Sequence, residues 1–175
     1  MKVLILNGPM GIGKTTVGTC IADKHPGTAF IDGDWCMDLH PFVGTKETKE
    51  MAIDNILHMI GNYSKCSACH MVVLAWLMDE DWVCEKLSTE IRNMGLEAKQ
   101  VTIVCEEKQL KEQWAADRNC PWRTDEWLAV ALRSLEHFSK SDDCIKTDGL
   151  TIDEVAEAVY DMCQVSNGDG SCGSK

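Results

Sequence analysis

The chain has 175 residues and a formal net charge of −11, and 45% of its residues are hydrophobic while 26% are charged. These values predict one soluble domain over residues 1–163 with a sizeable core, and the acidic surplus disfavours a general nucleic-acid binder, which needs a basic face. No apolar run reaches membrane-spanning length, and because Met1 leads directly into a predicted strand we expect no signal peptide.

The first predicted elements are a strand, a glycine-rich loop and a helix. Lys2–Leu6 is a short apolar run, typical of a buried strand. A helix is predicted over Lys14–Lys24, with Thr16 in its first turn and Pro26-Gly27 at its end. The loop between them fits the G-x-x-x-x-G-K-[ST] pattern of a phosphate-binding P-loop and reads Gly8-Pro9-Met10-Gly11-Ile12-Gly13-Lys14-Thr15.

This loop has the chemistry that a bound polyphosphate requires. Glycines allow the backbone to curl so that several N–H groups point at one anion, and the helix that follows directs its N-terminus at the same place. Lys14 is expected to reach the β- and γ-phosphates, and the Thr15 hydroxyl to ligate Mg²⁺. We therefore predict nucleotide binding by residues 8–16; the alternative is a glycine-rich turn without a ligand.

The rest of the chain alternates strands and helices. Further strands are predicted over residues 28–31, 71–76, 101–105 and 144–147. Further helices are predicted over residues 45–63, 81–94, 106–118, 124–138 and 151–162. This alternation implies a parallel sheet covered by helices on both faces. Residues 119–123 are predicted to form a loop, and the Gly- and Ser-rich residues 164–175 a disordered tail.

In a sheet of this kind the ligand lies beyond the carboxyl ends of the strands. Four segments follow strand ends and are expected to surround one pocket: the P-loop, Asp32 with Asp34, the residues after Trp76, and Thr147-Asp148.

Ten cysteines are scattered through the predicted strands and helices, as reduced thiols are in cytosolic proteins, so we expect a cytoplasmic location. Cys66, Cys69 and His70 match the C-x-x-C-H spacing of haem attachment. That attachment needs export, and a zinc site lacks a nearby fourth ligand. We interpret the segment as a helix end that leads into the next strand.

The chain resembles the small P-loop kinases of metabolites, which include shikimate kinase, gluconate kinase and antibiotic phosphotransferases. The resemblance covers about residues 1–163 and is carried by the P-loop, Phe30-Ile31-Asp32-Gly33-Asp34, an arginine-bearing lid near Arg118, and Ile145–Leu150. It implies a three-layer α/β fold whose five-stranded parallel sheet has the order 2-3-1-4-5, with a small lid. It also implies transfer of the γ-phosphate of Mg-ATP to a hydroxyl of a small acceptor.

The resemblance implies roles at matching positions. Asp32 would hold Mg²⁺ through water, and Asp34 would contact the acceptor hydroxyl and orient or deprotonate it. Arg118 would close over the phosphates from the lid, with Arg123 as the alternative lid arginine. The adenine would be bordered by Thr147, Asp148, Gly149 and Leu150.

The chain departs from these kinases on the acceptor side. No arginine precedes Arg92, although shikimate and gluconate kinases hold the acceptor carboxylate with arginines. Where gluconate kinase has basic residues, this chain has the acidic and aromatic stretch 76–81. Two interpretations are open for Lys46 and Lys49: they take the place of the missing basic residues, or they are simply solvated. We therefore expect a neutral or cationic acceptor.

The acceptor half is rich in aromatic residues, and Trp35, His40 and Trp76 are predicted to bind a flat or apolar part of the acceptor. The alternatives are core tryptophans and an ordinary loop histidine. Because Trp76 occupies the tip of the third strand, where a Walker B aspartate usually lies, Asp32 is expected to serve Mg²⁺.

Three functions remain open from sequence. The first is a kinase of small molecules that uses Mg-ATP. The second is a nucleoside or nucleotide kinase, favoured if Lys46, Lys49 or Arg92 lines the acceptor site. The third is a non-catalytic ATP-binding module. The expected partner is a small-molecule acceptor, with no nucleic acid or membrane, and both a monomer and a homodimer are compatible with the sequence.

Overall fold

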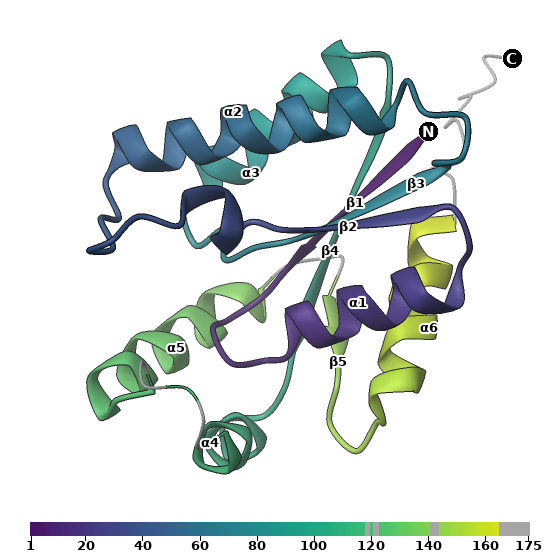
Figure 1. Ribbon diagram of the computed structural model, residues 1–175. Helices are drawn as coiled ribbons and strands as arrows, with labels where there is room; N and C mark the ends of the chain where they lie inside the picture. Colours follow the sequence, from purple (N-terminus) through teal and green to yellow (C-terminus); the bar gives the residue numbers. More distant parts are fainter. Residues whose placement is uncertain (118–119, 121–122, 141–143, 165–175) are drawn as a thin grey trace, which may run out of the picture.

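The computed structural model describes residues 1–117, 120, 123–140 and 144–164. The described residues form a parallel five-stranded sheet in the order β2-β3-β1-β4-β5, which confirms the predicted fold and strand order (Figure 1). The strands are β1 (Lys2–Asn7), β2 (Thr28–Asp32), β3 (Met71–Ala75), β4 (Glu97–Val104) and β5 (Cys144–Lys146).

Helices cover both faces of this sheet. In Figure 1, α2 and α3 lie above the sheet, and α1, α4, α5 and α6 lie below it. The α-helices are α1 (Lys14–Lys24), α2 (Lys46–Tyr63), α3 (Asp81–Asn93), α4 (Glu107–Ala116), α5 (Asp125–Phe138) and α6 (Ile152–Gln164). A short 3₁₀ helix, η1 (Asp34–Met37), follows β2 and was not predicted from the sequence.

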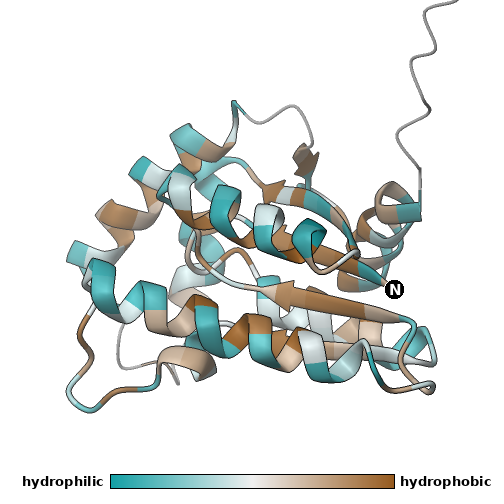
Figure 2. Ribbon diagram, turned by 90° about the horizontal axis from the view of Figure 1, so that it is seen from above, coloured by the Kyte–Doolittle hydropathy of each residue, from teal (hydrophilic) through white to brown (hydrophobic). Residues whose placement is uncertain are grey.

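The core is divided in two by the sheet. Leu4 and Leu6 of β1 face the cluster formed with α1, α4, α5 and α6, while Val3 and Ile5 face the cluster formed with α2 and α3. Strands buried on both faces read as continuous apolar runs, and Figure 2 accordingly shows brown, hydrophobic strands between helices of mixed colour. Among the described residues, no helix has both the length and the apolar character needed to cross a bilayer.

The structure differs from the predicted elements chiefly at β4. This strand begins at Glu97 rather than at residue 101, because residues 97–100 pair with β1 although they are mostly polar. The predicted tail falls almost entirely on residues 165–175, which lie outside the described residues. Cys66 and Cys69 lie in a turn between α2 and β3, where the Cys69 N–H donates to the Cys66 carbonyl at 3.0 Å.

Asn7 joins the end of β1 to the segment that follows β3. Its side-chain oxygen accepts hydrogen bonds from the N–H groups of Gly8 at 2.8 Å and Met78 at 3.1 Å, and its amide donates to the Met78 carbonyl at 3.0 Å. All three contacts are buried. One side chain therefore holds the start of the P-loop against the residues after β3.

Replacing this residue tests the connection. Asn7→Ala leaves buried backbone groups without partners, so we expect the free energy of unfolding to fall by roughly 2–4 kcal/mol. Urea denaturation measures the change. The matched control is Asn93→Ala, because Asn93 is exposed and makes one long hydrogen bond of 3.5 Å; its expected effect is below about 0.5 kcal/mol. Equal effects for the two variants would contradict the assigned role of Asn7.

Candidate functional site

The P-loop lies between β1 and α1 and packs closely on neighbouring elements. Gly8 has φ +147°, and a Cβ there would collide with the backbone carbonyl of Ile103 in β4. Gly11 has φ +82°, and its Cβ would lie 2.9 Å from both Arg123 Nη1 and the Trp114 ring. Glycine is required at both positions because neither the φ angle nor the space suits a side chain.

Lys14 folds back over this loop. Its ammonium group donates to the carbonyls of Gly8 and Pro9, each at 2.9 Å. Burial lowers the pKa of Lys14 to about 8, although the carboxylates of Asp34, Asp32 and Asp79, in that order, act to raise it. Lys14 is thus a cation held near its titration point, beside the place where the loop would receive phosphate.

Thr15 and Asp32 bring two side-chain oxygens together beside the loop. The Thr15 hydroxyl donates to Asp32 Oδ2 at 3.0 Å, and Asp32 Oδ1 accepts from the Asp34 N–H at 3.0 Å. Hydroxyl and carboxylate oxygens suit Mg²⁺. The described part of the chain contains no group of three or more His, Cys, Asp or Glu residues that could hold a metal, so nucleotide phosphates and water would have to complete the coordination.

Asp34 lies two residues after Asp32 and begins η1. Partial burial raises the pKa of its carboxyl group, and the charge of Asp32 raises it further, while Lys14 and a hydrogen bond from the Trp76 side chain oppose the rise. The two carboxylates therefore differ: Asp32 is engaged by Thr15, whereas Asp34 has a raised pKa and keeps contact with solvent. A carboxylate of the second kind suits proton transfer.

Trp76 requires a correction. The indole is 4% exposed and belongs to the core cluster of α2 and α3. A Cβ on Gly33 would collide with it, so the ring packs directly beneath the turn that carries Asp32 and Asp34. Its burial leaves no face for stacking on an acceptor, and its contribution to the site is the hydrogen bond to Asp34.

Trp35 and His40 remain on the surface of the acceptor side. Trp35 follows Asp34 within η1 and is largely exposed. His40 is also exposed, and its Nε2 lies 3.2 Å from Asp38 Oδ1. Both positions are accessible to a ligand, and contact with the acceptor stays a prediction for each.

The lid arginine that the structure describes is Arg123. Its Nη2 pairs with Asp117 at 2.6 Å, and its guanidinium lies 4.9 Å from the centre of the Trp114 ring. Its Nη1 is buried beside Gly11, without a hydrogen-bond partner among the described residues. Arg118, the other predicted lid arginine, lies outside the described residues. Sequence reasoning identified neither Asp117 nor Trp114 as a partner of this arginine.

The loop after β5 is tied to the start of α4. The Gln109 amide donates to the carbonyl and the hydroxyl of Thr147, each at 3.3 Å, and Asp148 Oδ1 accepts from the Glu106 N–H at 2.8 Å. Gly149 follows with φ +73°. These contacts position the loop, while contact between residues 147–150 and adenine stays a prediction.

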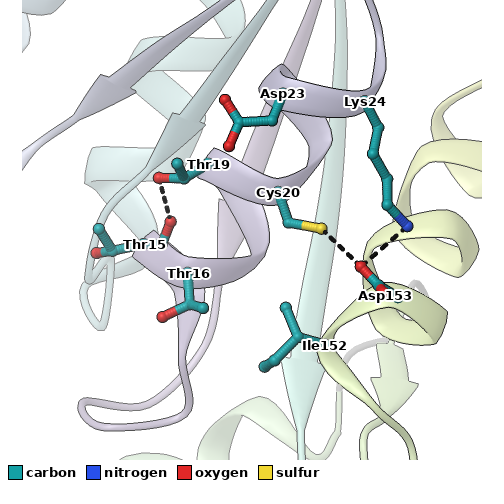
Figure 3. A pocket seen from close by; sticks show the side chains of 8 residues that line it. All are labelled: Thr15, Thr16, Thr19, Cys20, Asp23, Lys24, Ile152 and Asp153. Carbon is teal, nitrogen blue, oxygen red and sulfur yellow. Dashed lines mark hydrogen bonds and ion pairs between the residues drawn. The ribbon is translucent and has the colours of Figure 1, made fainter.

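An open groove of about 570 Å³ runs along α1 to the start of α6 (Figure 3). It begins at Thr15 and Thr16 and ends at Ile152 and Asp153. Asp153 is engaged by Lys24 at 3.0 Å and by the Cys20 thiol at 3.3 Å. The groove therefore connects the predicted metal ligand Thr15 with the helix that follows the predicted adenine loop.

The two lysines of the acceptor side are already paired. Lys49 lies 2.8 Å from Glu80 and 3.9 Å from Asp79, while Lys46 lies 4.0 Å from Glu50 and 5.8 Å from the centre of the Trp82 ring. Asp79 also acts on Lys14, a connection that sequence reasoning missed. The acidic residues that follow β3 thus already pair with Lys49 of α2, and they add negative charge to the site.

Comparison with solved structures identifies the same architecture in proteins of low sequence identity. The Deinococcus radiodurans tunicamycin resistance protein matches with a TM-score of 0.68 and 17% identity, over 95% of this chain and 98% of that one. A gluconokinase from Sinorhizobium meliloti matches with a TM-score of 0.69 and 17% identity, over 93% and 91%. The chain has the fold of the small P-loop kinases.

A shikimate kinase from Bacteroides thetaiotaomicron matches similarly, with a TM-score of 0.64 and 18% identity over 93% of this chain and 98% of that one. No family model matches the sequence, and a search of curated proteins finds no match. At these identities the likeness concerns the fold, and the chemistry depends on the residues described above.

The lowered pKa of Lys14 predicts a pH-dependent nucleotide affinity. Above pH about 8 the free protein loses the Lys14 charge, so we expect affinity for a fluorescent ATP analogue to fall by up to about tenfold per pH unit. Fluorescence titrations between pH 6.5 and 9.5, with Mg²⁺ present, measure this. Lys14→Met should bind weakly and lack the decline. A constant wild-type affinity, or the same decline in Lys14→Met, would contradict the prediction.

Proposed function

We propose that the chain is a kinase that transfers the γ-phosphate of Mg-ATP to a hydroxyl of a small neutral or cationic acceptor. The observation that carries this proposal is the pair of unlike carboxylates beside Lys14. Asp32 is engaged by the Thr15 hydroxyl, and Asp34 has a raised pKa and solvent access. Phosphoryl transfer needs one group for the metal and one for the acceptor, together with positive charge at the phosphates.

Residues 8–16 would bind the nucleotide. The loop backbone and Lys14 contact the phosphates, and the groove beyond Thr16 leaves room for the nucleoside towards α6. Thr15 and Asp32 would hold Mg²⁺, with Asp32 acting through water. Bound Mg²⁺ supplies charge neutralisation at the phosphate oxygens.

Asp34 would act on the acceptor. Its carboxylate accepts the hydroxyl proton as the acceptor oxygen bonds to the γ-phosphorus and the bond to the β,γ-bridging oxygen breaks, with ADP as the leaving group. The raised pKa makes Asp34 a better proton acceptor than an ordinary aspartate. The Trp76 hydrogen bond orients the carboxylate.

Arg123 would stabilise the transferring group from the lid. Its Nη1 is buried beside Gly11 with no hydrogen-bond partner in the part of the chain that the structure describes, while Asp117 and the Trp114 ring hold the rest of the guanidinium. A planar guanidinium with a free N–H edge suits the charge that develops on phosphate oxygens.

The charges of the acceptor side support a neutral or cationic acceptor. Lys49 is engaged by Glu80, and Lys46 is exposed beside Glu50. An anionic acceptor would need to displace these pairs and to approach Asp34 and Asp79. The same charges argue against a nucleotide acceptor, whose phosphate needs free basic side chains.

Replacing Asp34 tests the proposed activity. We expect Asp34→Asn to lower acceptor-dependent ADP release at least about 100-fold, with a smaller loss of Mg-ATP affinity, because Asp34 also acts to keep Lys14 charged. The panel comprises nucleosides, nucleotides, sugar acids, neutral sugars and amino-bearing antibiotics. Asp54→Asn, an exposed carboxylate on α2, is the control. The wild-type rate should fall as pH drops through the raised pKa of Asp34, because the proton acceptor must be ionised.

The panel also separates the alternatives. Efficient turnover of sugar acids would contradict the charge assignment, and turnover of nucleosides or nucleotides alone would favour a nucleotide kinase. If Mg-ATP binds but no acceptor accelerates ADP release, a non-catalytic ATP-binding module is favoured.

The role of Arg123 has its own test. We expect Arg123→Ala to lower kcat by about 10²–10³-fold, because its guanidinium acts mainly on the transition state, while the Kd for Mg-ATP rises less than about tenfold. Arg133→Ala, which removes an exposed arginine from α5, should leave both values unchanged. Equal losses in kcat and nucleotide affinity would instead assign Arg123 to ground-state binding.

A further inference from the structure

Exposed apolar side chains gather in one short segment next to the site. Ten large hydrophobic side chains are exposed in the described part of the chain, and four of them lie within residues 35–43. We call these four the apolar strip; their exposed fractions are 78% for Trp35, 39% for Leu39, 59% for Phe42 and 42% for Val43. Exposed apolar groups that cluster in this way mark binding surfaces more often than isolated ones do.

The backbone of this segment is held in place, so the exposure does not result from a loose chain. The Asn55 amide of α2 donates to the Cys36 carbonyl at 3.0 Å, and the Thr48 hydroxyl donates to the Val43 carbonyl at 2.6 Å. Between these two points, Met37 is buried against the core of α2 and α3. The four side chains of the strip therefore face outward from a segment that is anchored at both ends.

The strip continues directly from the group that would activate the acceptor. Trp35 is the next residue after Asp34, and both belong to η1. In Figure 1 the segment between η1 and α2 extends on the side towards which the parallel strands point. A molecule whose hydroxyl lies at Asp34 can thus place its remaining part over the strip.

We propose that the acceptor is amphipathic: a hydroxyl-bearing polar head lies at Asp34, and an alkyl or aryl group covers the apolar strip. This inference rests on the proposed kinase function and names its acceptor class. The polar head is neutral or cationic, because Lys49 is engaged by Glu80 and the carboxylates of Asp34 and Asp79 lie at the site. A second copy of this chain is a less suitable occupant, because a net charge of −11 opposes close approach of two copies.

Titration with the neutral, apolar fluorescent probe N-phenyl-1-naphthylamine tests the strip. We expect saturable binding to the full chain and at least a tenfold loss of affinity in Trp35→Ser/Phe42→Ser. The matched control is Trp127→Ser/Met94→Ser, which removes two exposed apolar side chains from other parts of the surface and should stay within about twofold of wild type. Because both pairs are exposed, circular dichroism should show folded protein in each case.

Chain length provides the second measurement. Methyl, butyl and octyl β-glucoside should displace the probe with affinity that rises by roughly twofold to fourfold per added methylene, as burial of each CH₂ predicts. Where a glucoside is phosphorylated, kcat/KM should rise in the same order. Both trends should disappear in Trp35→Ser/Phe42→Ser.

Two results would overturn the inference: equal probe affinity in wild type and in Trp35→Ser/Phe42→Ser, and displacement of the probe that does not depend on the alkyl chain length of the glucoside. Self-association that is lost in the variant while probe binding is unchanged would assign the strip to an interface between copies. The proposed function is judged separately by Mg-ATP binding: its absence, with probe binding intact, would overturn the kinase proposal and leave the strip as a site for an apolar ligand.

Discussion

The site depends on one desolvated cation and the carboxylates that act on it. Desolvation lowers the pKa of Lys14 to about 8, and Asp34, Asp32 and Asp79 oppose this effect. A charge removed from water without compensation is costly, so a buried lysine tends to lose its proton. With a pKa of about 8, Lys14 stays charged at neutral pH, and three carboxylates from two other segments act to preserve that charge. In the proposed function, Asp32 would serve the metal and Asp34 the acceptor.

The order of the strands brings these groups together. β3 lies between β1 and β2, and the three strands are parallel. The P-loop, the Asp32–Asp34 turn and the residues after β3 therefore follow neighbouring strands at the same, carboxyl-terminal end of the sheet. Asn7 joins the first of these segments to the third through hydrogen bonds with Gly8 and Met78. Beneath the second segment, Trp76 packs against Gly33. The buried contacts of Asn7 and Trp76 thus hold the segments of the site in place.

The two sides of the site differ in character. On the nucleotide side, Arg123 is oriented by an ion pair with Asp117 and by the Trp114 ring, which leaves one N–H group directed at the P-loop. On the predicted acceptor side, Lys49 is paired with Glu80, and the segment that follows Asp34 carries four exposed apolar side chains. A polyphosphate and an uncharged or cationic molecule would meet environments of matching chemistry.

The sequence by itself determined most of the strands and helices through short-range periodicity and the P-loop through a motif of fixed spacing, whereas the strand order followed from the resemblance to the small P-loop kinases. It also placed Asp32 and Asp34 beside the loop, since both follow a strand end. Only the tertiary structure decided the burial of Trp76, the extension of β4 back to Glu97, and the pairing of Arg123 with Asp117. Burial, cross-strand pairing and ion pairs depend on neighbours that a local pattern does not contain, so the sequence suggested these residues without assigning their contacts.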